Sequence, residues 1–313
     1  MNGVLKRSVV VGSAVAVMLS IGSPAAFADD LADILERARA ATYTATRLTV
    51  SAWGDHTNLL RERVEHAQGA EMIRVDQTWS MVGNGRTIRM GDVPEGVAFM
   101  TTSPAVVTDR YRVGEVAECT HLRRTCSFIP ILEGDRVRAH MLIDTRTGAP
   151  LITYVYDGAG RTYRTVSLSE FSPHRTYEWP QGTADVPLEV VMQDDSSAVP
   201  QELYGYELVD VFDGPASSEQ GFYSDGLFSF SLFTMPLDTV VAGFEEPLVM
   251  STDRGAYDLL PTARDVRLHW EGSDRHYVLV GDLPPDHLEA VLDELPDPGT
   301  GNILTRIWRA IFG

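Results

Sequence analysis

The sequence predicts an α+β protein, in which an antiparallel sheet with helical cover is followed by a smaller α+β unit. One amphipathic helix near the start precedes a long series of short runs with a period of two, and turn signals separate these runs. A second, shorter series of such runs then ends in another amphipathic helix. The chain has 313 residues, 44% of them hydrophobic and 22% charged, which is typical of a globular protein of roughly two domains.

The first 28 residues are typical of a secretory signal peptide. A basic pair, an apolar run and a small-x-small motif follow one another at Lys6-Arg7, Val9–Ile21 and Ala26–Ala28. The alternative is an uncleaved anchor helix, but the apolar run is shorter than the ~20 residues that span a bilayer. We therefore expect cleavage between Ala28 and Asp29, and a periplasmic or otherwise extracytoplasmic location.

The chain is strongly acidic, with 26 Lys and Arg against 44 Asp and Glu and a net charge of −18. Loss of the two basic residues of the signal peptide deepens this charge to 24 − 44 = −20. Nucleic-acid binding is excluded, because the clustered Lys and Arg that neutralise phosphates are missing. Anionic lipid headgroups repel an acidic body, so a membrane contact would require a cationic segment or a membrane-bound partner.

The first predicted helix covers residues 31–40, with Leu31, Ile34, Leu35 and Ala38 on one face and Asp30 as a suitable N-cap. Beyond it the period changes to two, as in Leu48-Thr49-Val50-Ser51-Ala52. Further strand-like runs follow at residues 59–66, 71–77, 86–90, 111–117, 127–132, 136–143, 151–156 and 161–171. Turn signals such as Gly83-Asn84-Gly85 separate them, which indicates antiparallel hairpins.

Two cysteines, Cys119 and Cys126, lie between the runs 111–117 and 127–132. In an extracytoplasmic protein this spacing favours a structural disulfide that staples a hairpin near its turn, worth about 2–3 kcal/mol. The alternative is a redox-active pair, which normally has the form C-x-x-C in a βαβ context, and the sequence shows neither feature. Two cysteines also exclude multi-cysteine zinc and iron–sulfur sites.

A loose, proline-containing segment separates the two series of strands, with a polar run at residues 193–197. We expect a first domain at 29–180, a linker at 181–199 and a second domain at 200–297, followed by a tail at 298–313.

The second domain shows the clearest alternation of the sequence. Apolar residues recur in every second position at Phe228, Phe230 and Leu232, and again at Val266, Leu268 and Trp270. Pro284-Pro285 then opens a helix whose apolar face is Leu288, Val291, Leu292 and Leu295. These patterns predict a small sheet packed against at least one helix.

No motif in the sequence indicates an enzyme. There is no G-x-S-x-G elbow, no Walker A loop and no G-x-G-x-x-G after a strand. The eight histidines show no metal-binding spacing, and we interpret them as exposed or strand-surface residues. Acidic pairs such as Asp194-Asp195 would suit acid–base catalysis, but an acidic composition also produces such pairs in solvated loops. We predict no catalytic residues, no cofactor and no metal.

Several segments, taken in order, carry a family resemblance. They are YRVG (111–114), LIDTRTGAPL (142–151), YDGAGRTYRTVSLSEFSP (156–173), YSDGLFSFS (223–231) and VLVGDLPPDHLEAVLDEL (278–295). Together they resemble the MucB/RseB family, the regulators of the envelope-stress sigma-E response. The resemblance implies a LolA-like half-open antiparallel β-barrel with helical cover, followed by a smaller α+β C-terminal domain.

The resemblance also implies a function. Members of the family bind the extracytoplasmic domain of a membrane anti-sigma factor and shield it from proteolysis, and a lipid or lipopolysaccharide-like ligand weakens that binding. By position, the partner-binding candidates in this chain are Tyr223, Asp225, Phe228 and Phe230. The alternative is that these four residues build the domain, because an alternating Phe/Ser strand usually buries one of its faces.

The tail differs in character from the acidic body. Its apolar residues Ile303, Leu304, Ile307, Trp308, Ile311 and Phe312 fall on one helical face, with Arg306 and Arg309 on the other. This pattern predicts a helix that lies on a membrane surface or on a partner, while the alternative is a helix docked on the protein's own core. The alternative function for the whole chain is a LolA-like lipid or lipoprotein carrier.

Overall fold

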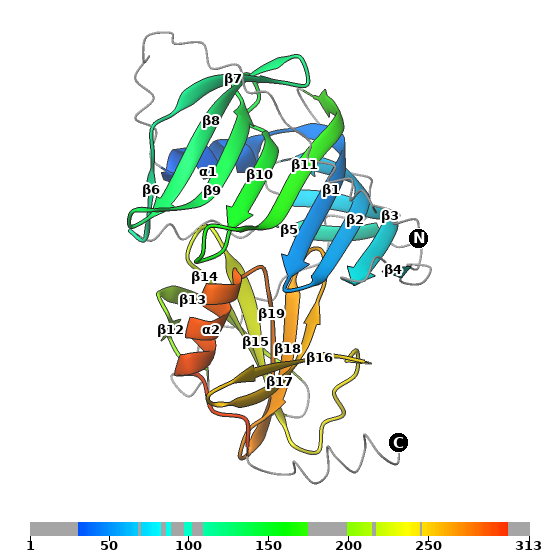
Figure 1. Ribbon diagram of the computed structural model, residues 1–313, viewed down its shortest axis with the longest axis vertical. Helices are drawn as coiled ribbons and strands as arrows, with labels where there is room; N and C mark the ends of the chain where they lie inside the picture. Colours follow the sequence, from blue (N-terminus) through cyan, green and yellow to red (C-terminus); the bar gives the residue numbers. More distant parts are fainter. Residues whose placement is uncertain are drawn as a thin grey trace, which may run out of the picture.

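The computed structural model describes residues 31–67, 70–82, 86–88, 97–101, 109–174, 199–214, 217–244 and 246–299. These residues form two antiparallel sheets, which we call the N-terminal sheet and the C-terminal sheet, stacked end to end (Figure 1). The predicted signal peptide with its cleavage site at Ala28 and Asp29, nearly all of the predicted linker, and residues 300–313 of the predicted tail lie outside the described residues. No described helix is long and apolar enough to cross a membrane.

The N-terminal sheet follows the first helix, α1 (Leu31–Ala40). Its strands are β1 (Tyr43–Trp53), β2 (His56–Ala67), β3 (Ala70–Val82), β4 (Arg86–Ile88), β5 (Val97–Thr101), β6 (Tyr111–Val113), β7 (Ala117–His121), β8 (Arg124–Glu133), β9 (Arg136–Asp144), β10 (Pro150–Tyr156) and β11 (Thr162–Pro173). The order along the sheet is β4-β3-β2-β1-β11-β10-β9-β8-β6, with β5 paired to β3 and β7 paired to β8.

The N-terminal sheet is half-open and has helical cover, as predicted. Its path ends in β4 on one side and β6 on the other, and no ladder of the described residues joins these two ends. α1 covers one face of β8, β9 and β10 (Figure 1). Leu31 and Ile34 of α1 are buried in the same core cluster as Ile129, Ile131 and Met141. The 3.6-residue periodicity therefore gave the correct helix and the correct buried face.

Two parts of this sheet differ from the prediction. The run 111–117 is not one strand, because Gly114 interrupts it and its amide donates a hydrogen bond to the Pro130 carbonyl. β6 and β7 therefore pair separately with the two ends of β8. β5 was not predicted at all, since its short sequence, VAFMT, has no period of two that would distinguish a strand.

The predicted disulfide is present. Cys119 on β7 lies directly opposite Cys126 on β8 in the ladder register, and the two sulfur atoms are bonded. Both residues are buried, in a cluster with Leu142, Leu151 and Ile152. The bridge therefore staples the β7–β8 hairpin and also belongs to the packing of the sheet.

The C-terminal sheet contains β12 (Glu202–Leu203), β13 (Tyr206–Asp213), β14 (Glu219–Ser224), β15 (Ser229–Pro236), β16 (Leu248–Thr252), β17 (Gly255–Pro261), β18 (Val266–Glu271) and β19 (Arg275–Gly281). Its order is β12-β13-β14-β15-β19-β18-β17-β16, and α2 (Pro285–Glu294) packs on one face. The predicted apolar face of α2 is confirmed, because Leu288, Val291, Leu292 and Leu295 are all buried. The predicted alternation in β18 is also confirmed, since Val266, Leu268 and Trp270 are buried.

Candidate functional site: a buried ionic joint between the two sheets

The YSDG segment forms the turn between β14 and β15, and Asp225 organises it. One Asp225 carboxylate oxygen accepts hydrogen bonds from the amides of Leu227 (3.0 Å) and Phe228 (2.8 Å). The other oxygen accepts one from the Tyr111 hydroxyl of β6, at 2.6 Å. Asp225 is fully buried, and burial raises the pKa of its carboxyl above the ordinary value. The segment is therefore a tight turn that is also bonded to the N-terminal sheet.

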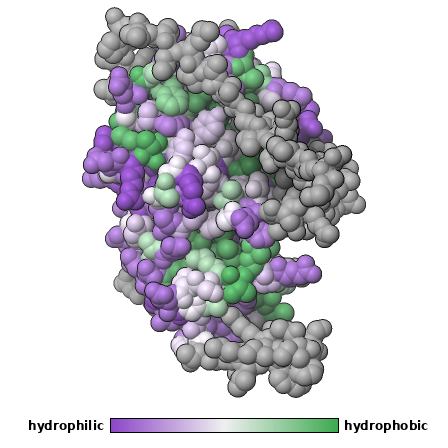
Figure 2. Space-filling model, in the orientation of Figure 1, coloured by the Kyte–Doolittle hydropathy of each residue, from purple (hydrophilic) through white to green (hydrophobic). Residues whose placement is uncertain are grey.

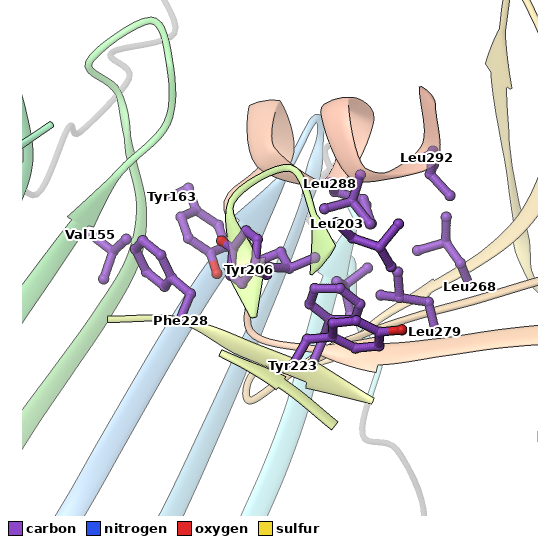
Figure 3. Packing of buried hydrophobic residues seen from close by; sticks show 14 of the residues in the cluster. Val155, Tyr163, Leu203, Tyr206, Tyr223, Phe228, Leu268, Leu279, Leu288 and Leu292 are labelled. Carbon is purple, nitrogen blue, oxygen red and sulfur yellow. The ribbon is translucent and has the colours of Figure 1, made fainter. Parts of the chain in front are cut away.

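The other candidate residues of this segment are also buried. Tyr223 stacks on Phe230 with ring centroids 4.8 Å apart, and its hydroxyl donates to the Pro200 carbonyl at 2.7 Å. Phe228 packs edge-on against Tyr111. Figure 3 shows Phe228 pointing toward Val155 of the N-terminal sheet, whereas Tyr223 lies among residues of the C-terminal sheet. In this structure Tyr223, Asp225, Phe228 and Phe230 thus build the core and the contact between the sheets, and no more than 2% of any of them is exposed.

The GDLPPDH segment brings two carboxylates to the same contact. Asp282 follows β19, and one of its carboxylate oxygens accepts from the Ser229 amide at 2.7 Å while the other accepts from Arg164 of β11 at 2.9 Å. The Asp282 carbonyl accepts from the Tyr163 hydroxyl at 2.6 Å. Asp282 therefore bonds the end of β19 both to the start of β15 and to the N-terminal sheet.

Asp286 lies in the first turn of α2, where the helix dipole favours a negative charge. Arg138 of β9 donates to both Asp286 carboxylate oxygens, at 3.0 and 2.9 Å, and the Gly158 amide donates to one of them at 2.9 Å. Burial works against ionisation of Asp286, but the hydrogen bond and charge of Arg138 hold its pKa below the ordinary value. This fork-to-fork pair crosses from one sheet to the other, and such pairs are among the strongest of hydrogen-bonded contacts.

Glu133, at the end of β8, links the remaining charges. Its carboxylate accepts from Arg110 at 2.6 Å and from Arg138 at 2.8 Å, and it lies 3.0 Å from the His287 Nε2. Burial opposes ionisation of Glu133, but His287, Arg110 and Arg138 together hold its pKa well below the ordinary value. The His287 Nδ1 lies 2.7 Å from the Tyr206 hydroxyl, so both ring nitrogens have partners.

His287 corrects one prediction made from the sequence. We expected the histidines to be exposed or on strand surfaces, but the His287 side chain is fully buried, and only 5% of His66 is exposed. The physical reason is that the partner of His287, Glu133, lies 154 residues away along the chain and on the other sheet. No spacing rule within the sequence could have indicated this pair.

A second contact joins the sheets on the side of β1 and β2. Glu62 of β2 is fully buried and pairs with Arg47 of β1 at 2.7 Å and with Arg264 of the β17–β18 turn. In the same turn, the Thr262 carbonyl accepts from the Ser51 hydroxyl at 2.6 Å. The C-terminal sheet is thus held at two places by charged and polar groups, and we call these contacts together the joint.

A cavity of about 280 Å³ lies between α1 and the ends of β8 and β9. Its apolar lining includes Ile34, Ile129 and Ile143, and its polar lining includes Arg37, Asp144 and Arg146. The volume is close to the lower limit of roughly 300–1,000 Å³ that is usual for small-molecule pockets. The two arginines outnumber the one carboxylate of this partly apolar lining, which suits an apolar chain that carries an anionic group.

The charged residues of the joint are paired with one another. Among the described residues, no group of three or more His, Cys, Asp or Glu is placed to hold a metal ion. Arg110 of the joint also lines an open pocket, together with Glu202, Tyr204, Gly205, Glu207 and Glu294. The acidic pair Asp194-Asp195 and the tail candidates Ile303, Leu304, Ile307, Trp308, Ile311 and Phe312 lie outside the described residues.

Sequence reasoning missed the arginines of the joint. Arg110, Arg138 and Arg164 lie in or beside strands of the N-terminal sheet, where charged residues are ordinary on a solvated face. The only local signal came from their partners, since Asp225, Asp282 and Asp286 all belong to the two C-terminal segments that carry the family resemblance. Those segments indicated importance, but not that their carboxylates would meet arginines of another sheet.

No family model matches the sequence, and no curated protein matches it. Solved structures do resemble the chain. A MucA/MucB complex from Pseudomonas aeruginosa contains a chain that is 18% identical, with 86% of this chain and 99% of that chain covered and a TM-score of 0.46. MucB in complex with MucA(peri) is also 18% identical, with 82% and 94% covered and a TM-score of 0.45. A LolA superfamily protein from Nitrosomonas europaea is 11% identical, with 86% and 100% covered and a TM-score of 0.20. At such TM-scores the similarity carries no function over to this chain.

Proposed function

We propose that this chain is an extracytoplasmic regulator of an envelope-stress sigma factor. In this proposal it binds the external part of a membrane anti-sigma factor and shields that part from proteolysis, and it acts as a binding protein without catalytic chemistry. One observation carries the proposal: the segments that resemble the MucB/RseB family converge at the joint. Tyr111, Tyr163, Asp225, Asp282 and Asp286 come from four of those segments and bond the two sheets to each other.

The convergence supports a binding function because it makes one rigid receptor of two sheets. A binding surface that extends over both sheets requires a fixed angle between them, and a partner gains affinity when that angle is set before binding. Buried charge pairs fix such an angle more specifically than apolar contacts, because a shifted arginine leaves an uncompensated carboxylate. The residues of the MucB/RseB-like segments thus lie at the contact between the two sheets, where a receptor built from both sheets requires a fixed angle.

Release by a lipid or lipopolysaccharide-like ligand is part of the proposal. The cavity under α1 has a partly apolar lining in which Arg37 and Arg146 outnumber the one carboxylate, Asp144, and this suits an acyl chain bearing an anionic headgroup. By linkage, a ligand that weakens partner binding must itself bind more weakly to the partner-bound chain, by the same factor. Titrating the lipid with and without partner would measure that factor from both sides.

Affinity capture tests the partner. Residues 29–313 contain no lysine, so amine coupling attaches this form of the chain to a resin through its N-terminal amino group alone. The resin is incubated with detergent-solubilised membranes of the source organism, and eluted proteins and lipids are identified by mass spectrometry. We expect the eluate to contain a single-pass membrane protein with a sigma-factor-binding cytoplasmic part. We also expect membrane proteases to cleave the external segment of this protein more slowly when the chain is present. Unchanged cleavage would refute the shielding function.

The same experiment tests the alternative function, a LolA-like lipid or lipoprotein carrier. The cavity under α1 favours this alternative, because a carrier needs an apolar site for acyl chains. An eluate that contains lipid or lipoprotein but no single-pass membrane protein would support the carrier and contradict the regulator. The C-terminal sheet and its joint then would have no assigned role, and for that reason we rank the regulator first.

Location and membrane contact are proposals that need separate tests. We propose export with cleavage after Ala28, which N-terminal sequencing of the protein from a periplasmic fraction would check. We also propose that the tail, residues 302–313, lies on a membrane or a partner. Deletion of these residues should abolish flotation of the chain with liposomes, and unchanged flotation would contradict the membrane contact.

A further inference from the structure

The strand β16 forms one edge of the C-terminal sheet in the described part of the chain. Its sequence, Leu-Val-Met-Ser-Thr, contains no charged residue and no proline, and it pairs with β17 in an unbroken register from Leu248 to Thr252. Natural proteins usually protect a free edge with charges, proline or a bulge, because its unpaired amides and carbonyls would otherwise pair with another chain. β16 has none of these protections.

An exposed apolar side chain lies on this edge. Val249, in the middle of β16, is 68% exposed, whereas its neighbours Leu248 and Met250 pack against the core. Figure 2 shows a hydrophobic patch on the surface over the β16–β17 hairpin. Contiguous apolar surface of this kind on a soluble protein marks an interaction site more often than a solvated face. The combination of an open backbone edge and an exposed apolar side chain on it is an arrangement that accepts an added strand.

The charges near β16 indicate which kind of strand it accepts. Glu246 precedes the strand, Asp253 follows it, and Asp238 lies in the connection before it; all three are exposed. The neighbouring cation, Arg254, is occupied by Asp297 and by the Leu292 carbonyl at the end of α2. A partner strand beside β16 would therefore meet a net negative field, and basic residues near its ends would be attracted.

The opposite edge of the C-terminal sheet has a different character. There β12 has only two residues, and one of them, Leu203, is buried. The next residue, Tyr204, is covered by the Arg110 guanidinium, 4.5 Å from its ring centroid, and its carbonyl accepts a hydrogen bond from the same group. This edge is closed by a residue of the N-terminal sheet, whereas β16 lies at the side of the sheet away from that contact.

We infer that β16 accepts an extended peptide as an additional antiparallel or parallel strand of the C-terminal sheet. The peptide has alternating aliphatic residues with Lys or Arg toward its ends. This inference rests on the proposed function and deepens it, because the peptide is a segment of the external part of the anti-sigma factor. Strand addition also explains shielding in physical terms, since a peptide paired to a sheet edge is held by its backbone away from a protease.

Hydrogen exchange on the full chain is the first test. In the free protein we expect rapid exchange of those β16 amides that do not pair with β17, both in residues 29–313 and after deletion of 300–313. Slow exchange that becomes rapid on deletion would show that the tail already covers β16, and this would overturn the inference. The measurement does not depend on the partner.

The second test uses the membrane protein captured as described above. Overlapping synthetic peptides covering its external segment are titrated against the chain and two variants, Val249→Lys on the edge and Val240→Lys as a matched control outside the strand. We expect one peptide to slow exchange in β16, at least tenfold weaker binding by Val249→Lys, and less than threefold change in Val240→Lys. Circular dichroism checks that both variants fold.

The outcomes separate the two proposals. If no single-pass membrane protein is captured, the proposed function fails and this inference fails with it. If a partner is captured but β16 exchange is unchanged, or the two variants weaken binding equally, only strand addition is overturned. In that second case the chain binds its partner at another surface.

Discussion

Replacement of Arg138 by methionine should weaken the joint substantially. The Arg138 side chain is 4% exposed and donates to Asp286, to Glu133 and to the Tyr156 carbonyl at 3.0 Å. Methionine retains the apolar stem and its packing but removes all of these donors. The variant therefore isolates the contribution of the guanidinium.

The magnitude follows from what each partner retains. Removing one member of a fully buried ion pair costs about 3–5 kcal/mol. Asp286 is 33% exposed and keeps the Gly158 amide, and Glu133 keeps Arg110 and His287, so neither carboxylate is left without compensation. We therefore expect a loss of about 2–3 kcal/mol in the free energy of unfolding, below the range for a fully orphaned charge.

Urea unfolding, followed by circular dichroism and tryptophan fluorescence, measures this loss. Arg161→Met is the matched control, because it makes the same substitution and the same change in net charge at a side chain that is 80% exposed. The pair of Arg161 with Asp157 should be worth less than about 0.5 kcal/mol. If the two variants are destabilised equally, the joint is not a stabilising contact. A double mutant with Asp286→Asn should show a coupling of about 1–2 kcal/mol, and additive effects would contradict a direct pair.

Three further predictions concern other parts of the chain. In urea unfolding, Gly148→Ala should lower the free energy of unfolding by about 2–4 kcal/mol and Gly160→Ala by only about 1 kcal/mol. Both glycines have positive φ, but only at Gly148 would the new Cβ meet a backbone oxygen, at 2.8 Å. Equal losses would contradict this steric argument. Cys119→Ala should lower the free energy of unfolding by about 2–3 kcal/mol and make it insensitive to reductant, whereas continued sensitivity would contradict a single bridge. The pKa of Glu133 is held below its ordinary value of 4.5, so the contribution of this carboxylate to the free energy of unfolding is fully present above that pH and is lost as the pH falls below it. Glu133→Gln should therefore flatten the acid limb of the curve of stability against pH. An unchanged slope would contradict the pairing.

Local pattern predicted several elements that have one buried face, but β17 was not predicted, although its buried Tyr257 and Leu259 also recur at a period of two. α1, β18 and α2 were predicted from apolar residues at periods of 3.6 or 2, because burial of one face imposes that period on the sequence. β5 has no such period, and the break at Gly114 depends on a hydrogen bond to Pro130 that no local pattern encodes. The type of an element was therefore predictable where its apolar residues show a clear period. The pairing of strands was predictable only where a short turn joins them.

The joint could not be predicted, because its contacts are nonlocal and its residue types are ambiguous. An aspartate after a strand, such as Asp282, is equally typical of a solvated turn and of a buried pair. The deciding quantity is the position of an arginine more than one hundred residues away, such as Arg164, 118 residues from Asp282. The resemblance between segments indicated which residues matter but not what they contact. It therefore could not show that Tyr223, Asp225, Phe228 and Phe230 are buried.

The joint also makes use of an unusual feature of the composition. Every basic residue after Lys6 is an arginine, although lysine would supply the same charge. A buried carboxylate needs a donor with fixed geometry and a weakly held hydration shell, and the planar guanidinium meets both requirements better than an ammonium group. Arg138 engages two carboxylates and a carbonyl at once, and Arg47 bonds Glu62 at 2.7 Å and both oxygens of Glu71 at 2.8 and 3.0 Å. A lysine at either position could satisfy the charge but not the geometry. The acidic charge is concentrated in the C-terminal sheet, because residues 31–174 contain 17 Arg and 17 Asp or Glu, whereas residues 199–299 contain 4 Arg and 20 Asp or Glu. Arg138 and Arg164 of the balanced N-terminal sheet therefore attract Asp286 and Asp282 of the acidic C-terminal sheet where the two sheets meet. The remaining carboxylates of the C-terminal sheet attract a cationic partner strand.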